Sequence, residues 1–184
     1  MTSIRQLSTL TFLSSCALTL FALPANADMK LSSTAISGGK IDQLHACSKN
    51  GGKNKSIPID VKDIPVGTSH LAIIMDDPDA RPVAGKIWVH WNVFNINVSS
   101  EAFSLATGQK PAGDIGKNDG SGRGYGGMCP PNGKHTYRVA VFALKEKVDV
   151  KISGFSAKTY TIEAFEKKFK NSIIEKTVVN GDFG

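Results

Sequence analysis

Two neighbouring segments contain the side chains best suited to chemistry. The first is the acidic turn Asp76–Pro82, where prolines restrict the backbone and are expected to hold Asp77 and Arg81 outside the helical region. The second is a strand-like run at residues 86–96. Strand alternation places on one face of this run Trp88, His90 and Asn92, and on the other face Val89, Trp91 and Val93. A histidine beside a tryptophan, next to a stiff acidic turn, predicts a binding site.

A third segment, far along the chain, supplies compatible side chains. It starts with the glycine-rich residues 116–127, followed by Cys129, Pro130 and Pro131. A strand-like run at residues 135–144 comes next, and alternation places on one of its faces His135, Tyr137, Val139, Val141 and Ala143. Both histidines therefore share a face with an aromatic residue two positions away. This repetition favours an aromatic-walled site for a small molecule.

The glycine-rich residues 116–127 do not fit a nucleotide-binding loop. Dinucleotide and P-loop sites need a helix N-terminus directly after the glycine turn, whereas prolines and a strand follow here. Two interpretations stay open for this stretch. It is either a purely structural loop or a loop whose backbone N–H groups form an anion-binding nest.

Catalytic and metal-binding interpretations draw on the same side chains. A hydrolase triad of Asp77, His90 and Ser121 lacks the G-x-S-x-G elbow that would present the serine. A metal site would use Asp77, Asp79, His90 and His135, whose spacing matches no common zinc pattern. His90 as a hydrogen-bonded core histidine is a further alternative. We expect no catalytic residue, no metal and no other cofactor.

The composition is that of an ordinary globular protein. The chain has 184 residues, of which 41% are apolar and 21% charged, which is enough for one domain with a sizeable core. The formal net charge is +6, but the lysines are scattered and form no long basic run. We therefore predict a surface that mildly attracts anions and no nucleic-acid partner.

The N-terminus has the pattern of a secretory signal peptide. Arg5 precedes an apolar run at residues 10–23, and Ala25-Asn26-Ala27 fits a small-x-small cleavage site. We predict cleavage after Ala27, which leaves residues 28–184 as a single domain, periplasmic or secreted, without a stable membrane span. Lipoprotein anchoring at Cys16 is the weaker alternative, because this cysteine lies inside the apolar run.

Export favours a disulfide in the mature chain. Only two cysteines follow the signal segment, Cys47 and Cys129, and an oxidising compartment favours their pairing. Two buried free thiols are the alternative.

The remaining pattern predicts a mainly β protein with one late helix. Strands are expected at residues 29–33, before a Gly38–Gly39 turn, at 57–61, and at 71–75, whose unbroken apolar run suits burial on both faces. Pro58 predicts an edge position for the second of these strands. Residues 97–115 show no period and predict a long loop. Helical spacing joins Ile162, Phe165, Phe169 and Ile173, with Thr159 or Thr161 as the N-cap.

Three blocks together resemble a known family. They are Asp77–Pro82, Trp88–Trp91 and Gly124–Tyr137, supported by Cys47–Ser56, Pro65–Thr68, Asn95–Ile96, Gly116–Asp119 and the late helix. In this order they resemble the phosphatidylethanolamine-binding protein family, in particular its bacterial Raf kinase inhibitor-like branch. The resemblance covers essentially all of residues 28–184.

The resemblance implies an antiparallel β-sandwich with peripheral helices and a small pocket. In the family this pocket takes phosphate, acetate, cacodylate or a phosphoethanolamine headgroup. The matching positions here are Asp77, Trp88, His90, Cys129, Pro130, Pro131, His135 and Tyr137, with Asp79 and Pro82 in the supporting turn. Imidazole, phenol and backbone N–H groups donate to oxyanions, so the chemistry of these residues agrees with the resemblance.

The sequence departs from the family pattern near the pocket mouth. Met128 stands before Cys129, Arg81 lies between Ala80 and Pro82, and Thr136 replaces an arginine. No pocket donor is removed, so we expect a non-enzymatic binding protein with altered ligand preference. Two alternatives remain: an inhibitor of a protease or kinase that binds its protein partner through the surface, and a hydrolase using Asp77 and His90. The sequence also leaves a homodimer open.

Overall fold

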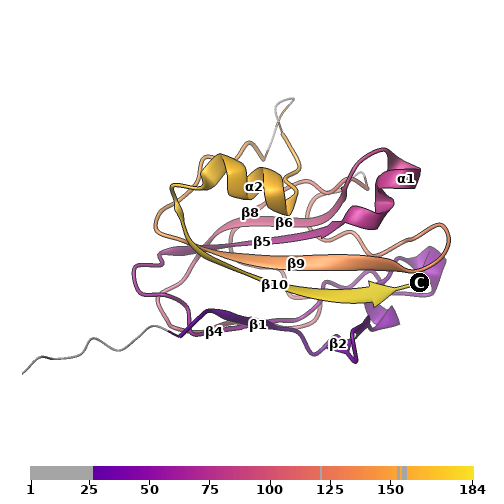
Figure 1. Ribbon diagram of the computed structural model, residues 1–184, viewed down its shortest axis with the longest axis horizontal. Helices are drawn as coiled ribbons and strands as arrows, with labels where there is room; N and C mark the ends of the chain where they lie inside the picture. Colours follow the sequence, from indigo (N-terminus) through magenta and orange to yellow (C-terminus); the bar gives the residue numbers. More distant parts are fainter. Residues whose placement is uncertain (1–26, 121, 153, 155–156) are drawn as a thin grey trace, which may run out of the picture.

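The computed structural model describes residues 27–120, 122–152, 154 and 157–184 (Figure 1). Residues 1–26 of the predicted signal segment, with Cys16, and the serine of the proposed triad, Ser121, lie outside the described residues. The strands are β1 Lys30–Ser32, β2 Ile36–Ser37, β3 Lys40–Ile41, β4 Ile59–Lys62, β5 His70–Asp77, β6 Trp88–Asn97, β7 Phe103–Leu105, β8 Asp114–Ile115, β9 His135–Leu144 and β10 Ile173–Phe183. The helices are η1 Gln43–His45, η2 Ser48–Asn50, η3 Pro78–Ala80, α1 Arg81–Ala84 and α2 Ile162–Phe169.

Two sheets form the predicted sandwich. The larger sheet has the order β2-β3-β10-β9-β5-β6-β8 and the smaller has the order β1-β4-β7. All pairings are antiparallel except that of β3 with β10. The smaller sheet covers one face of the larger sheet, and α2 covers the other (Figure 1). The mainly β sandwich with few helices is therefore confirmed.

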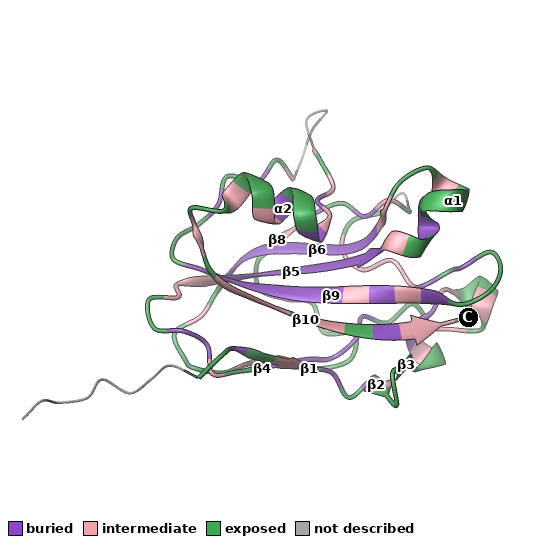
Figure 2. Cartoon of the chain, viewed as in Figure 1, coloured by how far each residue is buried: buried purple, intermediate pink, exposed green. Residues whose placement is uncertain are grey.

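Strand alternation builds a core on each face of the larger sheet. Leu71, Ile73 and Met75 of β5 point toward the smaller sheet, whereas Ala72 and Ile74 point toward α2. β5 is buried along almost its whole length, as Figure 2 shows, because it is covered on both faces and lies between β6 and β9. The predicted burial of residues 71–75 on both faces is confirmed.

A β-bulge changes the predicted alternation of β6. Met75 pairs with Trp91 and Asp76 with Val89, so His90 is an extra residue without a partner on β5. Beyond the bulge, Trp91 joins the core toward the smaller sheet, and the Asn92 side chain bonds the backbone of Tyr160 on the α2 side. The prediction that Asn92 shares a face with Trp88 and His90 was therefore wrong.

Other expectations need correction at element ends. The strand predicted at a sheet edge is β4, but it lies in the middle of its sheet. It begins after Pro58, so the proline precedes the first paired residue and removes no ladder bond. Residues 97–115 contain β7 and β8 rather than one long loop. The late helix ends at Phe169, and Ile173 begins β10, which pairs with β9 along its length. Thr161 is the N-cap, with its hydroxyl accepting from Ala164 N–H.

The acidic turn is helical where extended backbone was expected. Asp77 is extended, as predicted, but Arg81 has φ −53° and ψ −45° and begins α1. Pro82 lies in the first turn of α1, where a proline loses no intrahelical bond. This placement offsets the bias that Pro82 exerts against helical geometry at Arg81. None of the described helices is long and apolar enough to span a membrane.

Candidate functional site: a pocket at the ends of β5, β6 and β9

A cavity of about 920 Å³ opens where β5, β6 and β9 meet the loops near the disulfide. Its lining includes every residue predicted to bind ligand: Asp77, Trp88, His90, Cys129, Pro130, Pro131, His135 and Tyr137. The two residues of the predicted supporting turn, Asp79 and Pro82, lie outside the lining. Residues more than fifty positions apart in the chain therefore share one cavity, because β5 pairs with both β6 and β9.

His90 is fixed in the cavity wall by the bulge and by one carbonyl. Its Nδ1 lies 2.8 Å from the Gly126 carbonyl oxygen, so Nδ1 carries the donated proton. The Gly126 N–H in turn donates to the His90 carbonyl at 2.8 Å. Burial lowers the pKa of His90 below its usual 6.5, although the Gly126 carbonyl opposes this shift. The neutral ring leaves Nε2 without a protein partner among the described residues.

Asp77 orients the second histidine. Its Oδ2 lies 2.7 Å from His135 Nδ1, and both side chains are almost fully buried. Its Oδ1 accepts hydrogen bonds from the N–H groups of Asp79 and Ala80, which caps η3 and fixes the carboxylate. The hydrolase hypothesis paired Asp77 with His90, but the hydrogen-bonded partner is His135.

Tyr137 contributes a hydroxyl with no partner inside the protein. Its ring lies edge-on to His90 at 5.2 Å between centroids and stacks near His135 at 6.3 Å. The side chain is buried, and no described residue hydrogen-bonds its hydroxyl oxygen. Burial, followed by the charge of Asp77, raises the pKa of Tyr137, so the hydroxyl keeps its proton at physiological pH. A buried polar atom without a partner carries a desolvation cost that a ligand can relieve.

The supporting turn positions the mouth of the cavity. Asp79 Oδ2 accepts a hydrogen bond from Thr136 N–H at 2.8 Å, which ties the turn to the start of β9. The helix α1, which contains Pro82, presents Val83 to the cavity with 57% of the residue exposed. Trp88 also lines the cavity, with the Lys86 ammonium 5.4 Å from its ring centroid. The lining therefore includes apolar side chains next to the polar ones.

Asn118 organises the described part of the glycine-rich loop, whose glycine N–H groups largely donate within the protein. Asn118 Oδ1 accepts from Gly120 N–H and Gly122 N–H, and its Nδ2 donates to the Gly124 carbonyl. The N–H groups of Gly124, Gly126 and Gly127 also donate within the protein. Because these donors are occupied, the nest interpretation was wrong for them and the structural interpretation holds.

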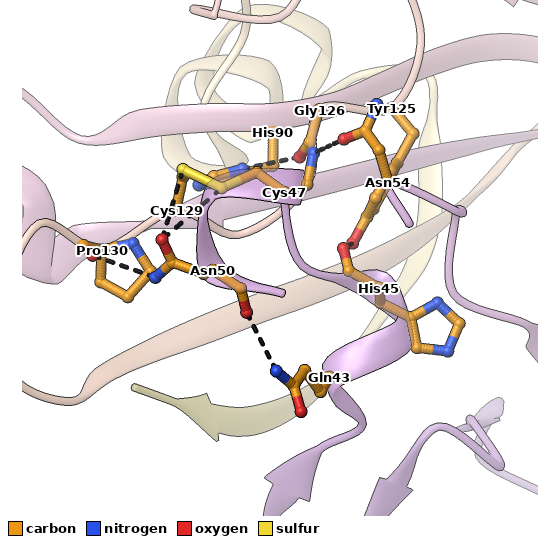
Figure 3. Close-up of a disulfide and its surroundings, with 11 residues drawn as sticks. Gln43, His45, Cys47, Asn50, Asn54, His90, Tyr125, Gly126, Cys129 and Pro130 are labelled. Atoms are coloured by element: carbon orange, nitrogen blue, oxygen red, sulfur yellow. Dashed lines mark hydrogen bonds between the residues drawn. A yellow bond between two sulfur atoms is a disulfide. The ribbon is translucent and has the colours of Figure 1, made fainter. Parts of the chain in front are cut away.

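A disulfide closes the rim of the cavity. It joins Cys47 to Cys129 across 82 positions of sequence, with 5.5 Å between the Cα atoms (Figure 3). Cys129 is exposed and Cys47 half-buried, unlike the buried thiols of the alternative interpretation. Around the bridge, Asn50 Nδ2 donates to the Pro130 carbonyl at 3.2 Å, and Asn54 Oδ1 accepts from Gly127 N–H. The bridge and these bonds hold the loop that carries the Gly126 carbonyl.

Several site residues were missed because their roles depend on the fold. Asn54, Asn118 and Tyr125 line the cavity, and the Gly126 carbonyl fixes His90. Of these residues, only Asn118 gave a local signal. It stands just before the glycines that begin at Gly120, and asparagine commonly bonds nearby backbone in turns. Within the described residues no three His, Cys, Asp or Glu side chains converge as metal ligands.

Comparison with known proteins identifies the family. The family model described as phosphatidylethanolamine-binding protein matches residues 31–184. A UPF0098 protein of Methanothermobacter thermautotrophicus is 35% identical over 132 residues, covering 70% of this chain and 82% of the relative. LppC of Mycobacterium tuberculosis, named as a lipoprotein, is 43% identical over 83 residues, covering 44% of this chain and 39% of the relative.

A solved structure shares the fold. The crystal structure of Escherichia coli YbcL, described as a member of the mammalian PEBP family, matches with a TM-score of 0.70 and 26% identity, covering 85% of this chain and 98% of YbcL. The sequence blocks, the sandwich and these matches lead to one conclusion: the chain belongs to the phosphatidylethanolamine-binding protein family.

Proposed function

We propose that the protein binds a small oxyanion, either phosphate or the phosphoryl group of a headgroup, in the cavity between His90, His135 and Tyr137. The observation that carries the proposal is the buried Tyr137 hydroxyl, which has no partner among the described residues and lies beside two imidazoles whose Nδ1 atoms are already held. Each Nε2 is then available to the ligand, as a donor when the ring is protonated. Hydrogen bonds between such donors and an oxyanion are charge-assisted and therefore strong.

We further propose that binding occurs without turnover. The Asp77–His135 pair resembles the base and orienting group of a hydrolase, and each Nε2 could act as a base. An activated nucleophile must lie within hydrogen-bond reach of that base, but no described serine, threonine, tyrosine or cysteine side chain is hydrogen-bonded to either histidine. The imidazole and phenol donors of the cavity suit recognition of a stable anion.

Export is part of the proposal. The signal-like segment before Asp28, the bridge between Cys47 and Cys129, and the name of the lipoprotein relative LppC all support a compartment outside the cytoplasm. We propose cleavage after Ala27, and mass spectrometry of the protein isolated from cells distinguishes this product from one acylated at Cys16.

Titration with inorganic phosphate tests the pocket through the histidine ring signals. We expect saturable NMR shifts at His90 and His135 and none at His70, which lies at the far end of β5. Tyr137→Phe removes only the hydroxyl, and we expect it to weaken phosphate binding by about tenfold, the value of one hydrogen bond to a charged group. The variant should not lower the free energy of unfolding, because this hydroxyl has no protein partner.

Tyr160→Phe is the matched control. The Tyr160 hydroxyl lies on the α2 side of the larger sheet and accepts from the Lys168 ammonium at 2.8 Å, so its removal costs about 1 kcal/mol of stability and leaves phosphate affinity nearly unchanged. The proposal is contradicted if the control variant loses more phosphate affinity than Tyr137→Phe, or if neither histidine signal shifts. A binding surface would then have to be sought outside the cavity.

The low pKa of His90 predicts tighter binding at lower pH. Its free ring is neutral near pH 7, and a bound anion favours the imidazolium, so binding takes up a proton. Affinity for sulfate, whose charge is constant in this range, should rise by up to about tenfold per pH unit until the pH reaches the pKa of the free ring. Isothermal titration calorimetry measures this trend, and a flat profile contradicts proton uptake by His90.

A further inference from the structure

A second hollow lies behind the wall of the main cavity. It has a volume of about 290 Å³ and is bounded by the segment 54–56, the segment 108–111 and the residues around Arg123. The two hollows share three lining residues, Asn54, Arg123 and Tyr125. We call this second hollow the basic cleft.

The lining of the basic cleft is positively charged. Lys55, Lys110 and Arg123 line it, and no aspartate or glutamate does. None of these three cations forms an ion pair with a described residue, whereas Lys86 and Lys176, for example, each contact a carboxylate. Three cations around one hollow without a counter-charge repel each other, and an anion between them removes that repulsion.

Two of the cations are held in place. Arg123 Nη2 donates to the Ile115 carbonyl at 2.6 Å, which leaves its other N–H groups free to donate. The aliphatic stem of Lys55 lies over Gly108, where a Cβ atom would come within 3.0 Å of Lys55 Cδ. The Gly108 N–H donates to the Ser56 carbonyl at 3.0 Å, so the two loops that bound the cleft are joined. The charges are therefore partly preorganised.

The floor of the basic cleft carries an unused donor. Trp91 lines the cleft, although only 1% of the residue is exposed, and its ring is edge-on to Tyr125 at 5.6 Å. Its indole N–H donates to no described residue, and its nitrogen is not among the polar atoms sealed from solvent. The nitrogen can therefore be reached from solvent, and its N–H can donate to an anion that enters the cleft.

We propose that the basic cleft is a second oxyanion site, which binds a phosphoryl group between Lys55, Lys110 and Arg123. The group is either free phosphate or part of a phosphate ester. The inference does not depend on the proposed function, because it uses a different set of donors. The two sites share a wall at Tyr125 and are therefore neighbours.

The two tryptophans allow the two sites to be followed separately. Trp88 lines the main cavity and Trp91 lines the basic cleft, and the chain has no other tryptophan. In a titration of nitrogen-labelled full chain with inorganic phosphate, we expect a saturable shift of the Trp91 indole N–H signal. Trp91 should respond even in a Tyr137→Phe variant with a weakened main pocket. A Trp91 signal that does not move with phosphate overturns the proposal, whatever Trp88 does.

Charge-matched variants separate a site from general attraction of anions. Lys55→Gln with Lys110→Gln should weaken the phosphate response of Trp91 by about tenfold, as expected for two partly exposed charges. Lys145→Gln with Lys147→Gln removes the same charge from exposed residues outside both hollows and should change affinity less than about twofold, because distant surface charges are screened. Equal losses in the two double variants overturn the proposal.

A parallel titration with methyl phosphate identifies the form of the ligand. Equal affinity of Trp91 for phosphate and methyl phosphate supports a site that admits phosphate esters. Selective loss with the ester supports a site for the free ion. A response of Trp91 that is the same for methyl phosphate and for chloride at equal ionic strength overturns the assignment of a phosphoryl site.

Discussion

Replacing Arg138 with methionine should lower the free energy of unfolding by about 3–5 kcal/mol, the usual cost of leaving one partner of a buried ion pair alone. Arg138 of β9 forms two parallel bonds to Asp76 of β5, at 2.8 Å from Nε and 2.9 Å from Nη2. The Asp76 side chain is fully buried, and Asp76 Oδ2 also accepts from Ile162 N–H at the start of α2. The pair therefore links two central strands to the helix that covers them.

Glu163, the second acidic partner of Arg138, provides a matched control. Arg138 Nη1 also contacts Glu163 at 2.6 Å, but the Glu163 side chain is 55% exposed. An exposed pair of this kind contributes at most about 1 kcal/mol, because water screens it. Denaturant unfolding of Arg138→Met and Glu163→Gln should therefore give clearly different losses. Similar small losses would show that Asp76 reaches solvent once its partner is removed.

The penalty in Arg138→Met should also depend on pH. Burial already raises the pKa of Asp76, with Arg138 opposing the shift, so removal of the arginine raises it further. A group whose pKa is raised on folding destabilises the protein where it must ionise, and this penalty falls as the pH drops through the folded pKa toward the lower pKa of the unfolded chain. The difference in stability between variant and wild type should therefore narrow in mildly acidic solution.

Regular periodicity made the centre of the fold predictable. The alternation of β9 predicted that Tyr137, Val139 and Val141 share one face, and the structure buries that face toward the smaller sheet. The continuous apolar run of β5 also identified its burial on both faces. Such patterns report burial directly, because each side chain must match the environment of its face.

Irregular geometry was not predictable from the same pattern. The bulge at His90 puts two consecutive side chains, His90 and Trp91, on the inner side of the sheet, and no residue type marks the extra position. The last helix ends at Phe169 although Ile173 continues its spacing, because pairing of Ile173 and the following residues with β9 replaces helical bonds. Tertiary pairing overrides local spacing in both cases.

Part of the cavity lining was predictable from the sequence, but the contacts among its residues were not. Strand faces and the family resemblance named Asp77, His90 and Tyr137, all of which line the cavity. The contact of Asp77 with His135 depends on the register between β5 and β9, and the Gly126 carbonyl that fixes His90 depends on the path of the glycine loop. These contacts decide which imidazole nitrogen stays unbonded among the described residues, so they decide which chemistry the cavity can support.

Replacing both bridge cysteines, Cys47→Ser with Cys129→Ser, should destabilise the protein by about 4 kcal/mol, as expected for a bridge that closes a loop of 82 positions. The bridge acts mainly by restricting the unfolded chain. Denaturant unfolding measures the loss. Wild-type protein treated with a reductant should approach the stability of the double variant, whereas the double variant should not respond to the reductant.

Phosphate affinity should change much less than stability in this double variant, by no more than about twofold, because the disulfide stabilises through the unfolded state. Cys47 N–H donates to the Met128 carbonyl at 2.9 Å, and the bond between Asn50 and Pro130 also remains, so the folded rim keeps its main-chain contacts. The Gly126 carbonyl then still holds His90 in position. A large loss of affinity would instead show that the covalent bridge itself positions the loop, and would place redox chemistry in control of ligand binding.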